Sequence, residues 1–463
     1  MTMPRPEDGV RLAIRPSRQA IGRVGGSVHM LIQAEPPAQP VRSDRRPVAL
    51  ALVIDRSGSM SGPATNSGST GSSGTPQLRR TARDSGATDK LSFVKAATHR
   101  LLDLMQDGDA VALITFDDTV DVVKPLTVLD SRSRRALAGA VKSIETGGST
   151  FLEGGFRSGL AQFTQEARQR YGCKLVLLSD GEANVGEQRP AVLAEVAAGA
   201  AHNGITTSTL GVGFDYNIAL MSTVAEAGNG DFSHIHTLEA LDEILREEFT
   251  TAAEVTARSV EVKLALPERV AFGTNLNSYR QESTEAGFKV FLGDLVRTKE
   301  FLFEITTPVP LESDQLGVQA NASYRDAEDR PREAAAAAAI NVCAADDALQ
   351  EPVDEEVIGK LLVQLPAQAE MATVLAYDAG DFTRASTELD ASRAALADVK
   401  RQYGSAVTAR AEMGSWEARL THLAASAEGR LFSAPDLKTM YAASYDLSRS
   451  RSIRRPGQGG PMK

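Results

Sequence analysis

Four short, almost continuously apolar runs between residues 47 and 251 constrain the fold of this chain more than any other feature. A strand that is apolar along its whole length must be covered on both faces, as in a parallel sheet between two layers of helices. Longer amphipathic stretches separate the runs, which is the pattern of right-handed strand–helix–strand crossovers. The predicted strands are Val48–Ile54, Ala110–Phe116, Lys174–Ser179 and Ile205–Val212.

Helical periodicity in the same region predicts the elements that cover this sheet. Thr119–Lys124 follows Phe116 after only two residues, so we expect an antiparallel edge strand there. The region is therefore predicted to be a doubly wound α/β domain. The predicted helices are Lys90–Met105, Ser131–Ile144, Leu152–Arg170, Pro190–Asn203, Ile218–Ala227 and Leu238–Thr250.

The residues on both sides of this domain show a different periodicity, in which polar and apolar residues alternate. This is the pattern of antiparallel strands with one solvent-exposed face. One β-sandwich built from both flanks, with the α/β domain inserted between its strands, accounts for it, and two separate small sheets are the alternative. The alternating segments are Val10–Ile21, Ser27–Ala34, Ser259–Leu266, Phe288–Leu292, Glu300–Thr306 and Leu316–Tyr324.

The C-terminal part of the chain has a third character. From Glu351 onward helix formers dominate, so we expect a helical hairpin followed by one or two further helices. The last fifteen residues carry five basic and no acidic side chains, which favours disorder or contact with an anionic surface. The predicted regions are a β segment at 1–46, the α/β domain at 47–251, a β-sandwich at 252–345, a helical region at 346–447 and a basic disordered tail at 448–463.

The charge and the cysteine content disfavour several classes of protein. The 463 residues include 50 Lys and Arg against 60 Asp and Glu, and a net charge of -10 disfavours phosphate binding, so we expect no nucleic-acid partner. The two cysteines form no CxxC pair, so neither a disulfide framework nor a zinc site is expected. No run approaches the roughly 20 apolar residues of a membrane span, the nearest being Ala334–Ile340, and residues 1–16 lack a signal sequence. We expect a cytoplasmic protein without a transmembrane segment.

Oxygen-bearing side chains follow the ends of the predicted strands. Asp55, Ser57 and Ser59 come directly after the first buried strand, and Asp180 follows the third. The carboxyl ends of parallel strands meet at one edge of an open sheet, where ligands bind. Thr150 lies on a glycine-rich loop before a predicted helix, where the backbone can bend toward the same point. Hydroxyls and carboxylates are hard donors that suit Mg²⁺ or Mn²⁺, so the pattern predicts a metal site.

These residues resemble a von Willebrand factor A domain with a complete metal-ion-dependent adhesion site. Asp55, Ser57 and Ser59 match the DxSxS triplet of the family, and Thr150 and Asp180 match the threonine and the aspartate of its second and third loops. The resemblance covers residues 47–251 and implies a Rossmann-like fold. It also implies that the serines and the threonine bind the metal directly, whereas the aspartates often act through water.

The charges of these residues favour binding over catalysis. Two carboxylates neutralise a divalent cation, and an octahedral ion can accept a sixth ligand, which an acidic residue of a partner protein can supply. A hydrolase would need a general base near the metal, and only Glu153 and Glu182 are close in sequence. His234 and His236 could form a ligand pair, but we favour a strand edge without metal. We therefore expect no catalytic residue, no organic cofactor and no enzymatic activity.

The chain departs from the family pattern at residues 61–89. In the family the motif runs almost directly into the first helix, here Lys90–Met105. Residues 61–75 contain twelve Ser, Gly or Thr, which predicts a mobile loop. A tolerated surface insertion is the simpler interpretation. The alternative is a regulatory cover that is phosphorylated or offers Asp84 or Asp89 as a pseudo-ligand.

The order of the predicted regions resembles bacterial relatives of inter-alpha-trypsin inhibitor heavy chains, which are often labelled as calcium-activated-channel homologues. Because the sequence shows no pore-forming segment, a channel function does not follow. The resemblance implies a non-enzymatic scaffold or adaptor that binds a partner protein through Mg²⁺, with Mn²⁺ or Ca²⁺ as other candidate ions. A regulatory or substrate-presenting subunit of an AAA+ ATPase or kinase-linked signalling complex is the alternative, and a metal-dependent hydrolase is a third.

Overall fold

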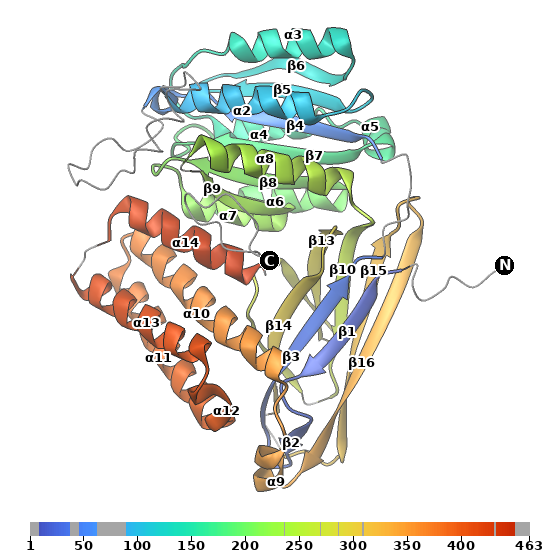
Figure 1. Cartoon of the computed structure of the whole chain (residues 1–463), viewed down its shortest axis with the longest axis vertical. Helices are drawn as coiled ribbons and strands as arrows, with labels where there is room; N and C mark the ends of the chain where they lie inside the picture. The colour runs from blue at the N-terminus through green and yellow to red at the C-terminus, as the bar shows by residue number, and fades with distance from the viewer. Residues whose placement is uncertain are drawn as a thin grey trace, which may run out of the picture. The chain divides into compact units, whose positions relative to one another are not determined.

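The computed structural model describes residues 9–37, 46–62 and 89–449, apart from residues 236, 269, 286, 308–309 and 430–431. The chain divides into two compact units. The first, called the α/β unit, is Val41–Val255. The second unit combines Met1–Pro40 with Thr256–Lys463, so the α/β unit is inserted into its sequence (Figure 1).

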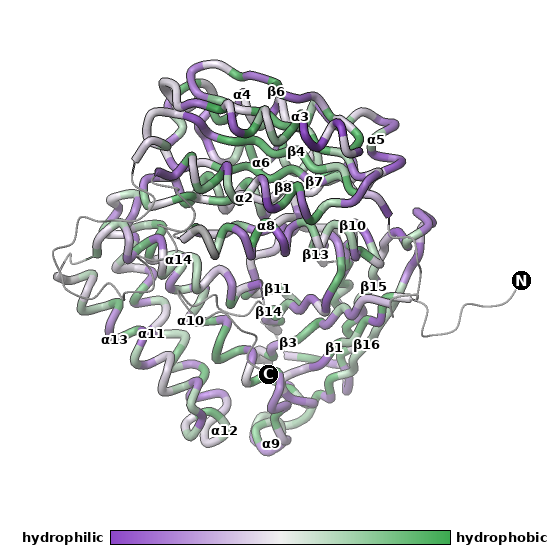
Figure 2. Tube along the Cα trace, turned by 45° about the horizontal axis from the view of Figure 1, so that its top comes forward, coloured by the Kyte–Doolittle hydropathy of each residue, from purple (hydrophilic) through white to green (hydrophobic). Residues whose placement is uncertain are grey.

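The α/β unit is built on one sheet with the strand order β6-β5-β4-β7-β8-β9. All neighbouring strands are parallel except β6, which pairs antiparallel with β5 at the edge. Every residue of β4 and β5 is buried, which explains their continuous apolar runs, and Figure 2 shows the hydrophobic character of the central strands. The strands are β4 (Val48–Asp55), β5 (Ala110–Phe116), β6 (Val120–Val128), β7 (Gly172–Ser179), β8 (Ile205–Val212) and β9 (Asn229–Ile235).

Helices cover both faces of this sheet. Side chains of α2, α3 and α8 share one hydrophobic core with Leu52 and Val176, whereas α4 packs on the opposite face, where Gly159 lies against Val53 and Leu175. The predicted doubly wound α/β fold is confirmed. The helices are α2 (Lys90–Leu104), α3 (Ser131–Lys142), α4 (Leu152–Leu160), α5 (Gln165–Arg170), α6 (Pro190–His202), α7 (Ile218–Ala227) and α8 (Leu238–Ala253).

The prediction of one helix over Leu152–Arg170 is wrong, because α4 and α5 are separate helices. Thr164 has extended backbone angles, and its side chain accepts a hydrogen bond from the backbone N–H of Ala167, which begins a new helix. Phe163, next to the break, is buried, so the interruption also directs an apolar side chain into the core.

The second unit contains a β-sandwich whose two sheets have the orders β1-β3-β14-β11 and β12-β13-β10-β15-β16-β2. In the first sheet β3 pairs with β14, and in the second β2 pairs with β16, so each sheet joins strands from both sides of the inserted unit. The two flanks of the α/β unit therefore form a single composite sandwich and not two separate small sheets. Its strands are β1 (Arg11–Pro16), β2 (Ala20–Gly22), β3 (Gly26–Glu35), β10 (Ala257–Ala265), β11 (Ala271–Asn275), β12 (Gln281–Thr284), β13 (Gly287–Leu295), β14 (Lys299–Thr307), β15 (Gln315–Arg325) and β16 (Pro331–Cys343).

The prediction of one alternating segment over Val10–Ile21 is also wrong. The chain leaves the first sheet after β1 and enters the second sheet at β2. Backbone hydrogen bonds hold the crossing: the N–H of Ser17 donates to the carbonyl of His29, and the carbonyl of Ser17 accepts from Asp354. Residues 17–19 therefore form a fixed corner between the two sheets.

The helical region packs on the sandwich rather than standing apart from it. Val357 and Leu361 of α10 share a hydrophobic core with Leu31 of β3 and Leu302 of β14, and all four are buried. The sandwich and the helices therefore form one folded unit. The helices are α9 (Ala345–Gln350), α10 (Glu355–Asp378), α11 (Phe382–Tyr403), α12 (Ser405–Thr408), α13 (Ala411–Gly429) and α14 (Ala434–Ser448).

The composition assigns Ser448 and Arg449 to the basic tail, but both are buried. Ser448 ends α14, and its hydroxyl donates to Ser278, while Arg449 donates to the carbonyl of Ser278. Residues 450–463 and most of the predicted insertion, residues 63–88, lie outside the described residues.

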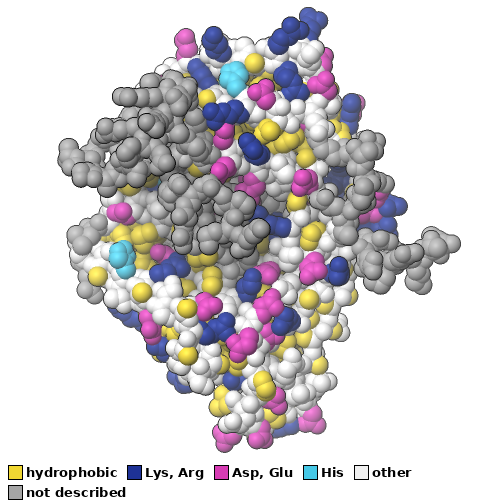
Figure 3. All heavy atoms as spheres, in the orientation of Figure 1, with side chains coloured by type: hydrophobic (Ala, Val, Ile, Leu, Met, Phe, Trp, Pro, Cys, Tyr) yellow, Lys and Arg dark blue, Asp and Glu magenta, His cyan; other side chains and the backbone are white. Residues whose placement is uncertain are grey.

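The helices and the surface charges bear on the class of protein. None of the helices in the described ranges has the length and apolar character needed to cross a membrane. On the face drawn in Figure 3, the basic and acidic side chains of the described residues are interspersed, without an extended basic area among them.

Candidate metal centre

The predicted site residues lie at the carboxyl ends of two neighbouring strands. β4 and β7 pair in parallel, with Ile54 opposite Leu178, so Asp55 and Asp180 leave the sheet side by side. Asp55 ends β4, and Asp180 directly follows β7. Both aspartates are fully buried. The strand order thus brings together two carboxylates that are 125 positions apart in the sequence.

Asp55 is held by hydrogen bonds on both carboxylate oxygens. Oδ1 accepts from the backbone N–H of Ser57 at 2.8 Å, and Oδ2 accepts from the hydroxyl of Ser179 at 2.6 Å. Burial raises the pKa of the Asp55 carboxyl to about 6, although these hydrogen bonds oppose the rise. The negative charge of Asp180 adds to the increase in pKa. A cation bound nearby would favour the ionised form of Asp55.

A single 3₁₀ turn, η2 (Gly58–Ser61), orients the side chain of Ser59 toward Asp180. Met60 in this turn is fully buried in the core and anchors it. The hydroxyls of Ser57 and Ser59 lie 3.0 Å apart, and Ser59 donates to Oδ1 of Asp180 at 2.7 Å. Hydrogen bonds therefore link Asp55, Ser57, Ser59 and Asp180 into one continuous chain.

Thr150 approaches the same point from the loop before α4. Its backbone N–H donates to the side-chain oxygen of Asn184 at 2.8 Å, and its carbonyl accepts from the backbone of Asn184. A Cβ atom added at Gly181 would lie 3.2 Å from Oγ of Ser59 and 3.6 Å from Oγ1 of Thr150. The two hydroxyls therefore border the same small space, which a glycine at position 181 keeps open. Asn184 is a positioning residue that sequence reasoning missed.

The glycine-rich loop at 147–148 is tied to the first loop by its backbone. Gly147 donates to the carbonyl of Arg56 at 2.7 Å, and Gly58 donates to the carbonyl of Gly148 at 2.9 Å. A Cβ at Gly147 would lie only 1.9 Å from Oδ2 of Asp117, so this close approach requires glycine. Asp117 itself forms an ion pair with Arg56 at 3.0 Å. These contacts fix the loop that carries Thr150.

Lys90 is the second residue that sequence reasoning missed. It is the first residue of α2, it is buried, and its Nζ lies 2.7 Å from Oδ2 of Asp180 and 3.5 Å from Oδ2 of Asp215. Gly213, with a φ of 76°, leaves room for the lysine, because a Cβ there would lie 2.9 Å from Cε of Lys90. The insertion separates Lys90 from the DxSxS motif, so no local pattern indicated it.

The donor set fits a hard divalent cation. Among the described residues no three His, Cys, Asp or Glu side chains gather around one point, so a cation here would be held partly by hydroxyls. Ser57, Ser59 and Thr150 supply hydroxyls, and Asp55 and Asp180 supply the negative charge. Such uncharged and charged oxygen donors suit Mg²⁺ or Mn²⁺. Gly58 and Ser59 are exposed, so the site is accessible from solvent at this turn.

The other residues considered for the site have different roles. Glu153 accepts from the backbone N–H of Glu187 and from Arg157, and these hydrogen bonds hold the pKa of its carboxyl below the ordinary value. Such a carboxylate is a weak base. Glu182 is exposed.

Two further candidates are also engaged elsewhere. His234 is buried in β9 with its Nδ1 3.0 Å from the hydroxyl of Tyr216, and His236 lies outside the described residues. Asp89 caps α2 by accepting from the backbone N–H of Ser92 at 2.8 Å, so its carboxylate is engaged as a helix cap. Asp84 lies outside the described residues.

The fold agrees with that of known proteins. Residues 49–247 match the family model of the von Willebrand factor type A domain. The chain is 25% identical over 177 residues to the uncharacterized protein YfbK of Escherichia coli (strain K12), which covers 38% of this chain and 30% of that protein. It is also 25% identical over 240 residues to human inter-alpha-trypsin inhibitor heavy chain H3, covering 50% of this chain and 24% of that protein. The chain thus spans well under half the length of these two curated relatives.

Similarity to solved structures extends over both units. A protein described as von Willebrand factor type A from Catenulispora acidiphila superposes with a TM-score of 0.63 at 16% sequence identity, covering 95% of this chain and 91% of that chain. At this identity the similarity concerns the fold alone. It includes the β-sandwich and the helical region as well as the α/β unit, because the coverage extends over nearly the whole chain.

Proposed function

We propose that this protein, in which residues 49–247 form a von Willebrand factor type A domain, is a divalent-metal-dependent protein-binding scaffold. Ser57, Ser59 and Thr150 would hold Mg²⁺, together with Asp55 and Asp180, and an acidic residue of a partner protein would complete the coordination. The hydrogen-bonded chain from Asp55 to Asp180 is the observation that supports the proposal, because it joins hard oxygen donors of four residues and includes the exposed Ser59.

The charge of the loaded site supports a carboxylate as the partner group. Asp55 and Asp180 supply two negative charges and a bound divalent cation two positive ones. Lys90 adds a further positive charge 2.7 Å from Asp180, which the sequence-based charge count omitted. These four charges sum to one positive charge. Asp215 lies 3.5 Å from Lys90, but its side chain is 74% exposed, so solvent screens it and a partner carboxylate is the group that would neutralise the loaded site.

Metal-dependent capture of partners is the direct test. The full chain is used to isolate binding proteins in Mg²⁺ and again in EDTA, and Mg²⁺ binding is measured by calorimetry. Ser59→Ala removes one hydroxyl from an exposed turn, so it should leave the fold intact while weakening Mg²⁺ binding and partner capture. Asp55→Ala should abolish both.

Glu182→Gln is the matched control, because Glu182 is exposed and two residues from Asp180. This variant should bind Mg²⁺ and partners as the parent does. Retention of the same partners in EDTA and in Ser59→Ala would contradict the proposal. Glu153 and Glu182 also test the hydrolase alternative. An activity that uses one of them as its general base should be lost in Glu153→Gln or in Glu182→Gln.

A subunit of an AAA+ ATPase or kinase-linked complex would use the same site and differ only in the partner. Co-purification that depends on ATP as well as on Mg²⁺ would favour this alternative. Deleting residues 351–463 would not separate the two, because α10 covers Leu31 and Leu302 of the sandwich and its loss would expose them. Single surface substitutions on the helices are therefore the appropriate variants.

A further inference from the structure

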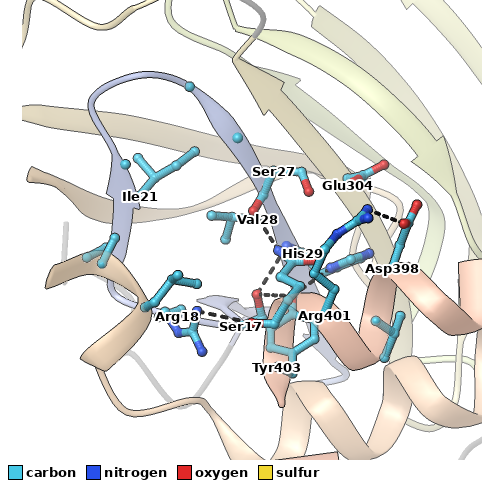
Figure 4. A pocket seen from close by; sticks show the side chains of 18 of the residues that line it. Ser17, Arg18, Ile21, Ser27, Val28, His29, Glu304, Asp398, Arg401 and Tyr403 are labelled. Carbon is cyan, nitrogen blue, oxygen red and sulfur yellow. Dashed lines mark hydrogen bonds and ion pairs between the residues drawn. The ribbon is translucent and has the colours of Figure 1, made fainter. Parts of the chain in front are cut away.

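A cavity of about 520 Å³ lies in the second unit, where the sandwich meets the helical region (Figure 4). Residues of β3, β14, the corner at 17–18, α9, α10 and α11 line it, so it lies within one folded unit. Much of its wall is apolar, including Ile21, Val28, Leu365 and Val399. An apolar cavity of this size with a few converging polar groups is the usual form of a small-molecule site.

Arg18 is the polar group that most needs explanation. Arg18 lines the cavity, and the residue is 9% exposed. Its Nη1 makes one long hydrogen bond of 3.4 Å to the carbonyl of Gln402, its Nε is buried without a hydrogen-bond partner, and the guanidinium lies 5.6 Å from the ring centre of Tyr403. No carboxylate of a described residue forms an ion pair with it. Burying a guanidinium without a counter-ion is unfavourable, so the cavity wall carries an uncompensated positive charge.

Three neutral polar groups beside Arg18 are already bonded to one another. The hydroxyl of Tyr403 lies 2.7 Å from Nδ1 of His29 and 2.9 Å from Oγ of Ser17, and Ser17 accepts from the backbone N–H of His29. If Ser17 donates to Tyr403 and Tyr403 donates to Nδ1, both hydroxyl hydrogens are used, and Nε2 of the buried His29 carries the hydrogen of the ring. His29 also lines the cavity, and no described residue accepts from its Nε2.

The remaining charges lie away from Arg18. Figure 4 shows Glu304 and the ion pair between Arg401 and Asp398 on the opposite side of the cavity. Glu304 is the cross-strand neighbour of His29. Because Asp398 already neutralises Arg401, Arg18 is the cation left to attract an anion, and Glu304 disfavours a second negative charge on the ligand.

We propose that this cavity binds a small monocarboxylate with an apolar body. Its carboxylate would pair with the guanidinium of Arg18, and its body would lie against the apolar wall that includes Ile21, Val28 and Val399. A bidentate pair with arginine is the strongest hydrogen-bonded recognition of a carboxylate, and it would supply the missing counter-ion. This site is independent of the metal centre, because it lies in the other unit.

The test uses the full chain and defined probes. The melting temperature is measured with 5 mM 3-phenylpropanoate or indole-3-acetate and with the matching primary amides, which have the same shape without the charge. At least one carboxylate should raise the melting temperature by about 3 °C more than its amide. Arg18→Met should remove this difference, and without ligand it should melt at the same temperature as the parent or higher, because an uncompensated buried charge has been removed.

Arg401→Met is the matched control, since it removes a cation of the same cavity whose charge is already paired. It should keep the response to the carboxylate, and Glu304→Gln should increase that response. The proposal is wrong if neither carboxylate exceeds its amide, or if Arg18→Met retains the difference. The proposal is also wrong if Arg401→Met and Arg18→Met both lose the response to the carboxylate. The rise in melting temperature would then depend on the total positive charge of the cavity and not on Arg18.

Discussion

The ammonium nitrogen of Lys90 lies 2.7 Å from Oδ2 of Asp180, and both side chains are buried. The other oxygen of the same carboxylate accepts from Ser59. Asp180 therefore joins the proposed metal ligands to a cation that belongs to the protein. The lysine stabilises the carboxylate when no metal is bound, and it repels a divalent cation that approaches.

Replacing Lys90 with methionine should have opposite effects on metal binding and on stability. Removing the repulsion should tighten Mg²⁺ binding about tenfold or more. Breaking the buried pair should lower the free energy of unfolding of the metal-free protein by about 3 kcal/mol. Calorimetry with Mg²⁺ and urea unfolding in EDTA measure the two effects. Lys95→Met is the control on the same helix, because among the described residues Lys95 bonds only the carbonyl of Lys142. Unchanged Mg²⁺ affinity in Lys90→Met would show that the lysine does not oppose the metal.

The raised pKa of Asp55, about 6, predicts how metal binding and stability vary with pH. Protons compete with the metal for this carboxylate, so Mg²⁺ affinity should fall about tenfold per pH unit below about pH 6. In the metal-free protein the folded state binds the proton more tightly than the unfolded state, so stability should decrease by about 3 kcal/mol as the pH rises from about 4 to about 6. Asp55→Asn should lack this decrease when the two proteins are compared by urea unfolding, and parallel curves would contradict the assignment.

Gly181→Ala should weaken metal binding without unfolding the protein. Its Cβ would lie 3.2 Å from Oγ of Ser59, in the space that the hydroxyls border. We expect Mg²⁺ affinity to fall about fivefold or more, since misplacing one donor disturbs a near-octahedral site. Gly199→Ala in α6 is the control, because nothing lies within 4 Å of its added Cβ, and it should gain up to about 1 kcal/mol of stability. An unchanged affinity in Gly181→Ala would place the ion elsewhere.

The shared core of the second unit predicts that its helices and sandwich unfold together. Leu361→Ala leaves a cavity against Leu31 and Leu302, so it should cost about 3 kcal/mol of unfolding free energy. Leu349→Ala should cost far less, because Leu349 is 54% exposed. Urea unfolding followed by circular dichroism and by the fluorescence of the single tryptophan, Trp416, should give one midpoint for the second unit. Separate midpoints for helices and strands would contradict the shared core.

Several elements followed directly from local patterns. The apolar runs at Val48–Ile54 and Ala110–Phe116 are strands because a sequence that is hydrophobic on both faces can be buried only between two layers. Residues 315–325 alternate exposed and buried side chains without exception, as their period of two predicts. In these cases each residue's preference and its final environment agree.

Other elements contradict their local preference. The alanine-rich run in β16 (Pro331–Cys343) would favour a helix by intrinsic propensity. It is a strand because it pairs with β15 along eleven residue pairs, from Gln315 opposite Asn341 to Arg325 opposite Pro331. Pairing with a neighbour that is already a strand outweighs a small propensity per residue. No local pattern in the run itself shows that this partner is present.

Some residues of the candidate sites could be selected from the sequence, and others could not. Asp55, Ser57, Ser59, Thr150 and Asp180 could be selected from the sequence because each stands at a strand end or on a glycine-rich loop, where chain direction alone places it at the ligand-binding edge. Lys90, Asn184 and the cavity with Arg18 could not be selected. The insertion separates Lys90 from the DxSxS motif, although Lys90 contacts Asp180. Arg18 and Tyr403 are close in space although almost the whole chain lies between them in sequence. Sequence periodicity determines which face of an element is buried, but only the tertiary fold decides which distant charges become neighbours and whether each has a counter-ion, because electrostatic interactions depend on distance in space and on burial.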